Sequence, residues 1–354
     1  MSIGTPSEQS SNYEYVTARV RSRKAKLYDE DDYRKLTRMG TGEIARFMEE
    51  SEYETEMNDL GARYSGVDLV EYALNRSRAK HFSDLLRWAD GRLYGYVARY
   101  LRRFDTWNAK TVLRGIYSGA DREAIETDLV RAGEFDEQFV SRLLDAGSVE
   151  AVVDLLDGTV LGAGLAEAYE EYEQHDRLVP LENAIDRAYY ENLMKGLPAD
   201  PSRPTALYIE FLRAEIDFRN LRNALRLARS GAEVDPSEYY IEDGDLFSAA
   251  DLDRLVGNTD ELLTRVRESR YGDRLSAALD DLETADSLMR FERALDAALL
   301  EYAEYLSRSY PLSVCPVFSY VLMKEREVRN VRAIARGREA GLGAEEIEDD
   351  LVVL

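Results

Sequence analysis

The sequence predicts an all-α protein, and three observations support this fold class. Runs of alternating Val, Ile and Thr bounded by tight turns, the pattern typical of strands, are nearly absent. Apolar residues instead recur at spacings of three and four, for example between Leu69 and Phe82 and between Leu288 and Tyr302. Proline, which interrupts helices, occurs only eight times in 354 residues.

Length and composition predict a folded chain of two or three domains of ordinary size. Apolar residues make up 45% of the chain and charged residues 32%. A single cysteine, Cys315, excludes an internal disulfide framework and a cysteine-based zinc site, and two histidines are too few for a multi-histidine centre. No apolar run approaches the ~18 residues of a membrane span, and the polar segment Met1–Tyr15 does not resemble a secretory signal. We therefore expect a soluble, intracellular protein.

The net charge of −23 argues against nucleic acid as a main partner, because phosphate binding requires a basic surface. It argues equally against adsorption to, or insertion into, anionic lipid. Only seven of the 46 basic residues are Lys. This acidic, Lys-poor balance favours a cytoplasm rich in salt, where a Debye length of about 3 Å at 1 M screens the self-repulsion. An ordinary acidic protein is the alternative, and a loss of stability at low salt would distinguish the two.

An internal repeat organises the chain into three copies. Each copy has an acidic residue, Asn three positions later, a base five positions later, Arg nine positions later, and Gly five positions after that Arg. The Asn residues are 112 and 110 positions apart. The three sets are Asp105, Asn108, Lys110, Arg114 and Gly119; Asp217, Asn220, Arg222, Arg226 and Gly231; and Glu327, Asn330, Arg332, Arg336 and Gly341.

The repeat extends upstream of these residues. A Glu followed three residues later by an aliphatic residue and then Asn or Asp recurs at Glu71, Glu182 and Glu292. Further upstream, an aromatic residue precedes a candidate N-cap in the arrangement of a hydrophobic staple. These dipeptides are Tyr28-Asp29, Phe135-Asp136 and Phe247-Ser248. The predicted division is a lead-in at 1–27, helical units at 28–119, 135–231 and 247–341, and a tail at 342–354.

Each unit is predicted to contain a short capped helical region followed by two longer helices, the last ending at the shared Gly in a left-handed conformation. On a helical wheel the acid and the Asn lie beside apolar positions, so both should be buried. The two bases lie on the opposite side and should face water or another subunit. Asn in an apolar stripe is typical of a hydrogen-bonded device that fixes register. Arg114, Arg226 and Arg336 fit either an assembly surface or a solvated helix face.

The sequence contains none of the common catalytic and cofactor-binding motifs. The chain has no phosphate-binding loop, no complete G-x-G-x-x-G, no G-x-S-x-G and no H-E-x-x-H. The magnesium motif D-D-x-x-D is also missing, since Asp280-Asp281 is followed by Thr284 at its last position. His81 fits a packing or surface residue, and Cys315 fits a small apolar filler. We therefore predict no catalytic, cofactor-binding or metal-binding residues and no cofactor.

Several segments carry a resemblance to a known family, namely Tyr15–Arg19, Leu27-Tyr28, Tyr33–Leu36, Phe104–Lys110, Asp217–Arg222 and Lys324–Arg332. They resemble the family formed by the C subunit of archaeal A-type ATP synthases, which is related to the d subunit of the vacuolar ATPase. The resemblance covers nearly the whole chain, and the acidic balance of the chain is similar to that of haloarchaeal members.

The resemblance implies a non-catalytic connector in the central stalk of a rotary ATP synthase. Three similar helical units would surround a pseudo-threefold axis as a funnel between the membrane proteolipid (K/c) ring and the D and F subunits of the stalk. This peripheral protein at the cytoplasmic face of the cell membrane would transmit torque for proton-driven ATP synthesis. The alternatives are a free-standing all-α scaffold that binds a partner helix in its concave face and, less favoured, an all-α metal-dependent enzyme.

Overall fold

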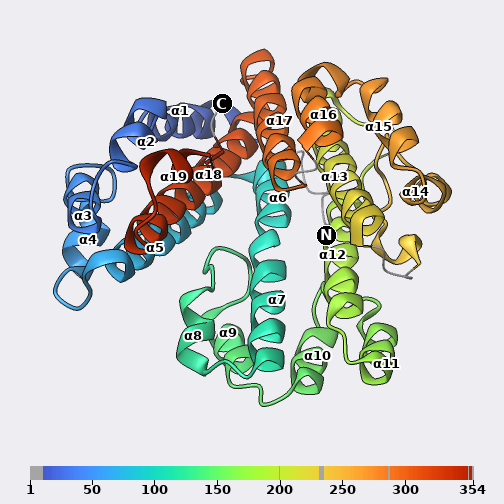
Figure 1. Cartoon of the computed structure of the whole chain (residues 1–354), viewed down its shortest axis with the longest axis horizontal. Helices are drawn as coiled ribbons and strands as arrows, with labels where there is room; N and C mark the ends of the chain where they lie inside the picture. Colours follow the sequence, from blue (N-terminus) through green and yellow to red (C-terminus); the bar gives the residue numbers. More distant parts are fainter. Residues whose placement is uncertain (1–10, 199, 231–234, 286–287, 350, 353–354) are drawn as a thin grey trace, which may run out of the picture. The chain divides into compact units, whose positions relative to one another are not determined.

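A computed structural model describes residues 11–198, 200–230, 235–285, 288–349 and 351–352. The all-α prediction is confirmed: these residues form helices joined by short links, and none of them lies in a strand (Figure 1). Within the same residues, no helix is both long and apolar enough to cross a membrane. The chain divides into two compact units, residues 1–101, 130–133 and 300–354 in unit 1 and residues 102–129 and 134–299 in unit 2.

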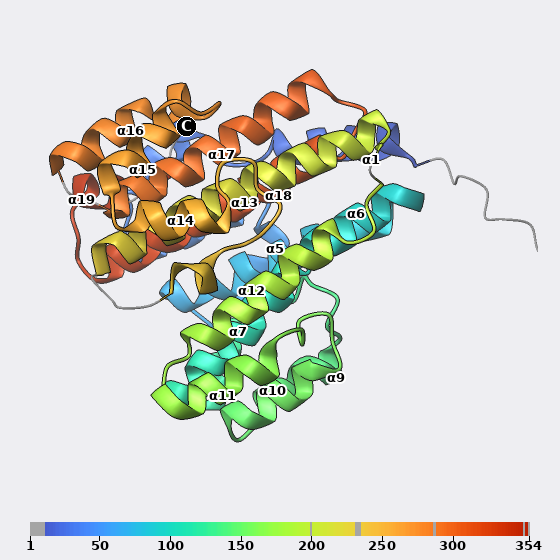
Figure 2. The same cartoon turned by 90° about the vertical axis from the view of Figure 1, so that its right-hand side faces the viewer.

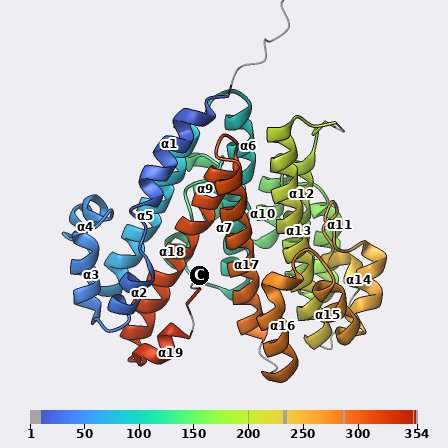
Figure 3. The same ribbon diagram turned by 90° about the horizontal axis from the view of Figure 1, so that it is seen from above.

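Unit 1 joins the two ends of the chain around one core. The long helices α5 and α18 lie side by side, and the short helices α2 and α3 pack against them (Figures 1 and 3). Apolar residues between Tyr28 and Leu74 share this core with Val328, Val331 and Ile334 of α18. The helices of this unit are α1 (Tyr13–Lys24), α2 (Glu30–Leu36), α3 (Thr41–Glu49), α4 (Glu54–Leu60), α5 (Gly66–Trp88), α6 (Gly91–Leu101), α18 (Cys315–Glu339) and α19 (Ala344–Glu348).

Unit 2 is built around α7, α12 and α13. Helix α12 packs against α7 and α13, while α10 and α11 gather near its first turns (Figure 2). Helix α14 packs against α13, and α17 crosses from this unit into unit 1. The helices are α7 (Arg103–Ser118), α8 (Arg122–Thr127), α9 (Glu137–Leu144), α10 (Val149–Asp157), α11 (Leu165–His175), α12 (Val179–Met194), α13 (Arg203–Ser230), η1 (Pro236–Tyr239), α14 (Ala249–Val256), α15 (Thr259–Arg267), α16 (Gly272–Ala285) and α17 (Leu288–Ser309).

Helix order follows the sequence repeat. Three short helices precede long helices at α2–α4, at α9–α11 and at α14–α16. The packed units nevertheless divide the first interval, 28–119, between residues 101 and 102. A helix at the chain end, α18, completes the core to which the first short helices belong. The boundaries of the five predicted sequence intervals therefore differ from those of the two packed units. The intervals stay a prediction from the repeat.

Predicted helix boundaries are confirmed wherever the structure describes them. Asp29, Asp136 and Ser248 each cap a helix by accepting a hydrogen bond from the backbone N–H three residues later. Gly119 and Gly341 adopt φ values of +72° and +81°, the left-handed region in which a side chain would be strained. The third glycine of the set, Gly231, lies outside the described residues.

Candidate functional site

The repeated arginines form bidentate ion pairs with the repeated glutamates of a different copy. In two of the pairs, Nε and Nη2 of the arginine lie 2.6–2.7 Å from the two carboxylate oxygens. In the third, Arg336 Nη2 lies 2.9 Å from Glu71 Oε2 and Nε contacts Oε1. The three pairs are Arg114–Glu182, Arg226–Glu292 and Arg336–Glu71.

The order of these pairs is cyclic. The first copy pairs with the second, the second with the third, and the third with the first. Two pairs lie within unit 2 and the last lies within unit 1. Each arginine side chain keeps 54–56% of its surface exposed, so each pair contributes little to the free energy of unfolding. The bidentate geometry of each pair nevertheless fixes how the two helices face each other. The prediction that these arginines form an assembly surface stays a prediction.

The preceding base of each copy repeats the same cyclic order. Lys110 pairs with Asp186 at 2.5 Å, and Arg222 pairs with Asp296 at 2.6 Å. Arg332 in the third copy donates to the amide oxygen of Asn75 at 2.8 Å. The expectation that these bases face water or another subunit is wrong for Lys110 and Arg222, whose side chains are 12% and 19% exposed. Each carries a carboxylate partner because a neighbouring helix covers that face.

Asp186 forms ion pairs with two cations. Besides Lys110, Arg219 of α13 contacts its carboxylate. Burial alone would raise the pKa of Asp186, but Arg219 and Lys110 outweigh it and hold the pKa below its usual value. Burial correspondingly lowers the pKa of Lys110. Helices α7, α12 and α13 of unit 2 therefore meet at a charged cluster in which two cations share one buried carboxylate.

The repeated acids are buried, as predicted, and each binds backbone N–H groups at the start of another copy. Asp105 accepts from Glu134 N at 2.8 Å and from Phe135 N at 3.1 Å. Asp217 accepts from Leu246 N at 2.8 Å, and Glu327 accepts from Tyr28 N at 2.6 Å. Each acid thus fixes the backbone beside an aromatic residue that precedes a capped short helix.

A hydroxyl group binds two of these acids but not the third. Tyr271 donates to Asp217 at 2.8 Å, and Tyr53 donates to Glu327 at 2.6 Å. Tyr53 and Tyr271 each lie two residues after a serine whose hydroxyl group donates to a carbonyl oxygen three residues earlier. In the second copy Thr159 makes the same bond, and the residue two positions later is Leu161. At that repeat position the second copy has no hydroxyl group. Consistent with this, burial raises the pKa of Asp105 to about 7, and the two backbone bonds only partly oppose the effect.

The repeated asparagines are buried, as predicted, and two of them clamp the backbone by both donating a hydrogen bond to it and accepting one from it. Asn220 donates to the carbonyl oxygen of Ile241 and accepts from its N–H, at 2.8 and 2.9 Å. Asn330 makes the same pair of bonds to Val352, at 2.9 and 3.1 Å. Asn108 is likewise buried, at 2% exposure. These bonds agree with the interpretation of Asn as a device that fixes register.

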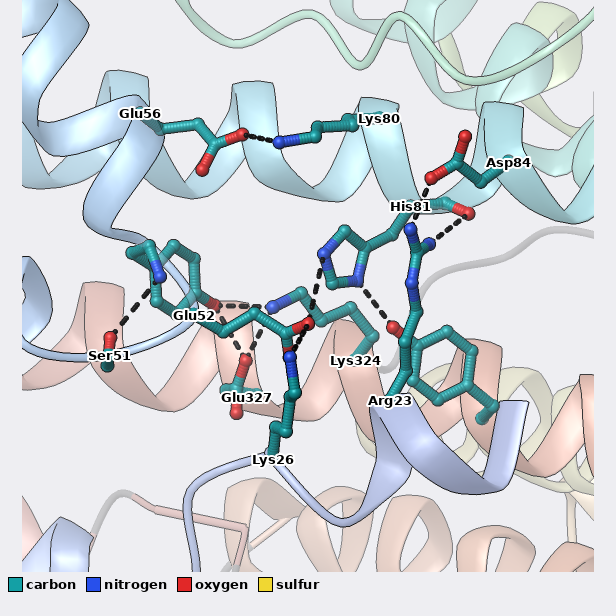
Figure 4. A network of polar contacts seen from close by, with 12 residues as sticks. Arg23, Lys26, Ser51, Glu52, Glu56, Lys80, His81, Asp84, Lys324 and Glu327 are labelled. Carbon is teal, nitrogen blue, oxygen red and sulfur yellow. Dashed lines mark hydrogen bonds and ion pairs between the residues drawn. The ribbon is translucent and has the colours of Figure 1, made fainter. Parts of the chain in front are cut away.

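A buried polar network distinguishes unit 1 (Figure 4). Lys324, with no exposed side-chain surface, donates to Glu327 at 2.7 Å and to the Tyr53 hydroxyl at 2.9 Å. Its ammonium also lies 4.2 Å from the centroid of the Tyr53 ring. Burial, followed by the nearby Glu327, raises the pKa of Tyr53 well above its ordinary value. The lysine is therefore the cation that compensates the buried Glu327 carboxylate.

His81 belongs to the same network and is a buried packing residue, one of the two roles expected for it. Its Nδ1 shares a hydrogen bond with the Tyr320 hydroxyl, and Arg23 donates to its carbonyl oxygen at 3.3 Å (Figure 4). Burial and the cations Lys324 and Arg23 lower the pKa of His81 to about 2. The imidazole is neutral at physiological pH, so its approach to Glu52 is not an ion pair.

Sequence comparisons place these features in a known family. The model of the ATP synthase (C/AC39) subunit family matches residues 16–350. The C subunit of the A-type ATP synthase of Haloferax volcanii is 64% identical over 97% of this chain and 98% of its own length. Its counterpart in Halobacterium salinarum is 59% identical over 97% and 98% of the two chains, and that in Methanococcoides burtonii is 36% identical over 98% and 96%. The chain belongs to the ATP synthase (C/AC39) subunit family.

Charged and aromatic side chains line a hollow in unit 1 of this family member. This hollow of about 460 Å³ is lined by Lys26, Tyr28, Asp32, Phe47, Glu50, Ser51 and Glu52. Burial raises the pKa of Glu52 there. Across the described ranges, no cluster of three or more His, Cys, Asp or Glu side chains is placed to hold a metal ion.

Sequence reasoning found the repeated glutamates but missed their role as partners of the arginines. The signal was present, because Glu71, Glu182 and Glu292 recur in step with the arginines. It also missed Lys324 and Tyr53, whose part in the site depends on α18 packing beside the first short helices. Nothing in the local pattern of either residue indicates a buried charge.

Proposed function

We propose that this chain is a non-catalytic connector of an A-type ATP synthase. It joins the membrane proteolipid ring to the D and F subunits of the central stalk and transmits torque during proton-driven ATP synthesis. It acts as a peripheral protein at the cytoplasmic face of the cell membrane. Membership of the ATP synthase (C/AC39) subunit family supports this role, as do relatives named as the C subunit of A-type ATP synthases, which match along nearly their whole length.

The observation that carries the proposal is the cyclic order of the repeated bonds. The arginine pairs link one copy of the repeat to another, and so do the backbone clasps, the hydrogen bonds from backbone N–H groups to the repeated acids. Three equivalent copies linked in this order favour a pseudo-threefold funnel. A connector that transmits torque must resist deformation between its parts, and bidentate pairs and buried clasps restrict such deformation.

We propose Arg114, Arg226 and Arg336 as part of the contact surface, because about half of each side chain is exposed beyond its ion pair. Changing all three to Glu should uncouple ATP hydrolysis from proton pumping. The matched control also changes Glu71, Glu182 and Glu292 to Arg, which restores the three pairs with their charges exchanged. An interface role predicts that the exchanged variant stays uncoupled. Restored coupling would mean that the arginines act only through their pairs.

Affinity purification tests the proposed partners. An affinity-tagged chain produced in a haloarchaeal host and purified from detergent-solubilised membranes at molar salt should carry the proteolipid ring and the D and F subunits in one particle. Mass spectrometry identifies the components and their stoichiometry. A chain that purifies without ring and stalk proteins would contradict the connector and favour the free-standing scaffold.

A further inference from the structure

Asp105 differs from its two counterparts in the groups that compensate its charge. The residue is 2% exposed, and within the described part of the chain its hydrogen bonds come from the backbone N–H groups of Glu134 and Phe135. Glu327 has an ammonium and a tyrosine hydroxyl in addition to its backbone donor. Asp217 has a tyrosine hydroxyl, with Arg270 Nη2 3.6 Å away.

Two neighbouring charged groups act on Asp105 in opposite directions. Helix α7, which carries it, packs against α8, α9, α10 and α12. Arg102, just before α7, favours the carboxylate, whereas Glu134, on the clasped segment itself, opposes it. Arg102 and Glu134 also contact each other, so the cation is shared with a second carboxylate. A buried carboxylate with this limited compensation is unfavourable in its charged form.

The clasp lies at a particular place in the chain. Glu134 is the first residue of unit 2 after the chain returns from the unit 1 segment 130–133. The bonds from Glu134 N and Phe135 N to Asp105 hold the start of this return against α7. Opening the segment would give the Asp105 carboxylate access to water, where its charge is favourable.

We propose that Asp105 is a proton-sensitive clasp: the segment around Glu134 and Phe135 is held closed when the carboxyl is protonated and opens more often when it is charged. The direction follows from linkage, because the closed state, with the raised pKa, binds the proton more tightly than the open state. Opening therefore increases as the pH rises from about 4 to about 7 and then levels off. The Glu327 clasp differs in its surroundings, because the ammonium of Lys324 lies 2.7 Å from that carboxylate.

Hydrogen exchange on the full-length chain in molar KCl tests the clasp. Exchange rates are measured by mass spectrometry between pH 5 and pH 8.5 and corrected for the intrinsic pH dependence of amide exchange. For peptides that cover Glu134 and Phe135, the opening equilibrium should increase by roughly tenfold per pH unit below about 7, with little change above 8. Peptides that cover Tyr28, clasped by Glu327, are the internal control and should show no such trend.

The variant Asp105→Asn keeps a neutral acceptor and should abolish the trend at Glu134 and Phe135. An opening equilibrium that is flat with pH in the wild-type chain overturns the proposal, and so does a trend that persists in Asp105→Asn. Should this variant not fold, the comparison of the Glu134 and Tyr28 peptides in the wild-type chain decides the question.

Discussion

Glu327 of unit 1 and Asp105 of unit 2 occupy the same position of the repeat, yet their buried carboxylates are compensated in different ways. Both bind backbone N–H groups at the start of another copy. Only Glu327 has a buried ammonium, supplied by Lys324, beside it. The repeat therefore preserves the hydrogen bond from the backbone to the acid, while the surrounding side chains decide how far the charge of each buried carboxylate is compensated.

The strongest test of this comparison removes the cation from unit 1. Lys324→Met leaves the Glu327 carboxylate buried without its counter-charge, and we expect a loss of about 3–5 kcal/mol in the free energy of unfolding. Chemical denaturation in molar KCl measures it. Lys35→Met, which removes a lysine from an exposed ion pair with Asp32, is the matched control and should change stability far less, because solvent screens that pair. Equal effects of the two variants would contradict the claim that Lys324 compensates a buried carboxylate.

A pH series should reveal the weakly compensated Asp105 of unit 2. Because the pKa of Asp105 is raised in the folded chain, the native state binds more protons than the unfolded state between about pH 4 and pH 7. Stability should therefore fall with rising pH in this window, by about 1.4 kcal/mol per pH unit at most, and level off above 7. Denaturation of wild type and Asp105→Asn in parallel isolates this contribution. Identical slopes would contradict it.

The tyrosine hydroxyl groups that donate to Asp217 and Glu327 provide a third test of how the buried carboxylates are compensated. Tyr271→Phe and Tyr53→Phe each remove a hydrogen bond to a buried carboxylate and should cost about 1.5–3 kcal/mol. They should also shift the pH dependence of stability in the direction already present at Asp105. Denaturation midpoints at pH 5 and pH 8 check both effects. A loss that is the same at both pH values would mean that the hydroxyls contribute packing alone.

The smallest effect is expected at the half-exposed arginine pairs. Replacing one of these arginines by lysine keeps the charge but loses the bidentate geometry, so each change should reduce stability by less than about 1 kcal/mol. The three variants are Arg114→Lys, Arg226→Lys and Arg336→Lys. Thermal melts of the three single variants check this. A drop of several kcal/mol in one variant alone would show that the three pairs are not equivalent.

Local features of this fold could be predicted from the sequence. Helical spacing indicated the fold class, and the caps Asp29, Asp136 and Ser248 depend on residues within three positions. The burial of Asn220 and Asn330 also followed from the apolar stripe of their own helix. Each of these features is decided by neighbours in sequence, which a single chain displays directly.

Long-range features could not be predicted in the same way. A helical wheel shows which side of a helix Lys110 occupies, but not that α12 covers this side with Asp186. Arg336 and Glu71 are 265 positions apart and pair because α18 lies beside α5. That closure also explains why packing divides the interval 28–119, which the repeat treats as one unit. Partner choice depends on tertiary packing, and helical periodicity carries no information about it.

The connector role is tested most directly by the ratio of proton pumping to ATP hydrolysis in inside-out membrane vesicles from a strain that lacks this chain. Pumping is followed by the quenching of a pH-sensitive dye, and hydrolysis by phosphate release from the same vesicles and from the soluble fraction. Our account predicts that ATP hydrolysis continues, now largely in the soluble fraction, while ATP-driven pumping is lost and returns when the chain is restored. Pumping at the wild-type ratio in the absence of the chain would contradict the account.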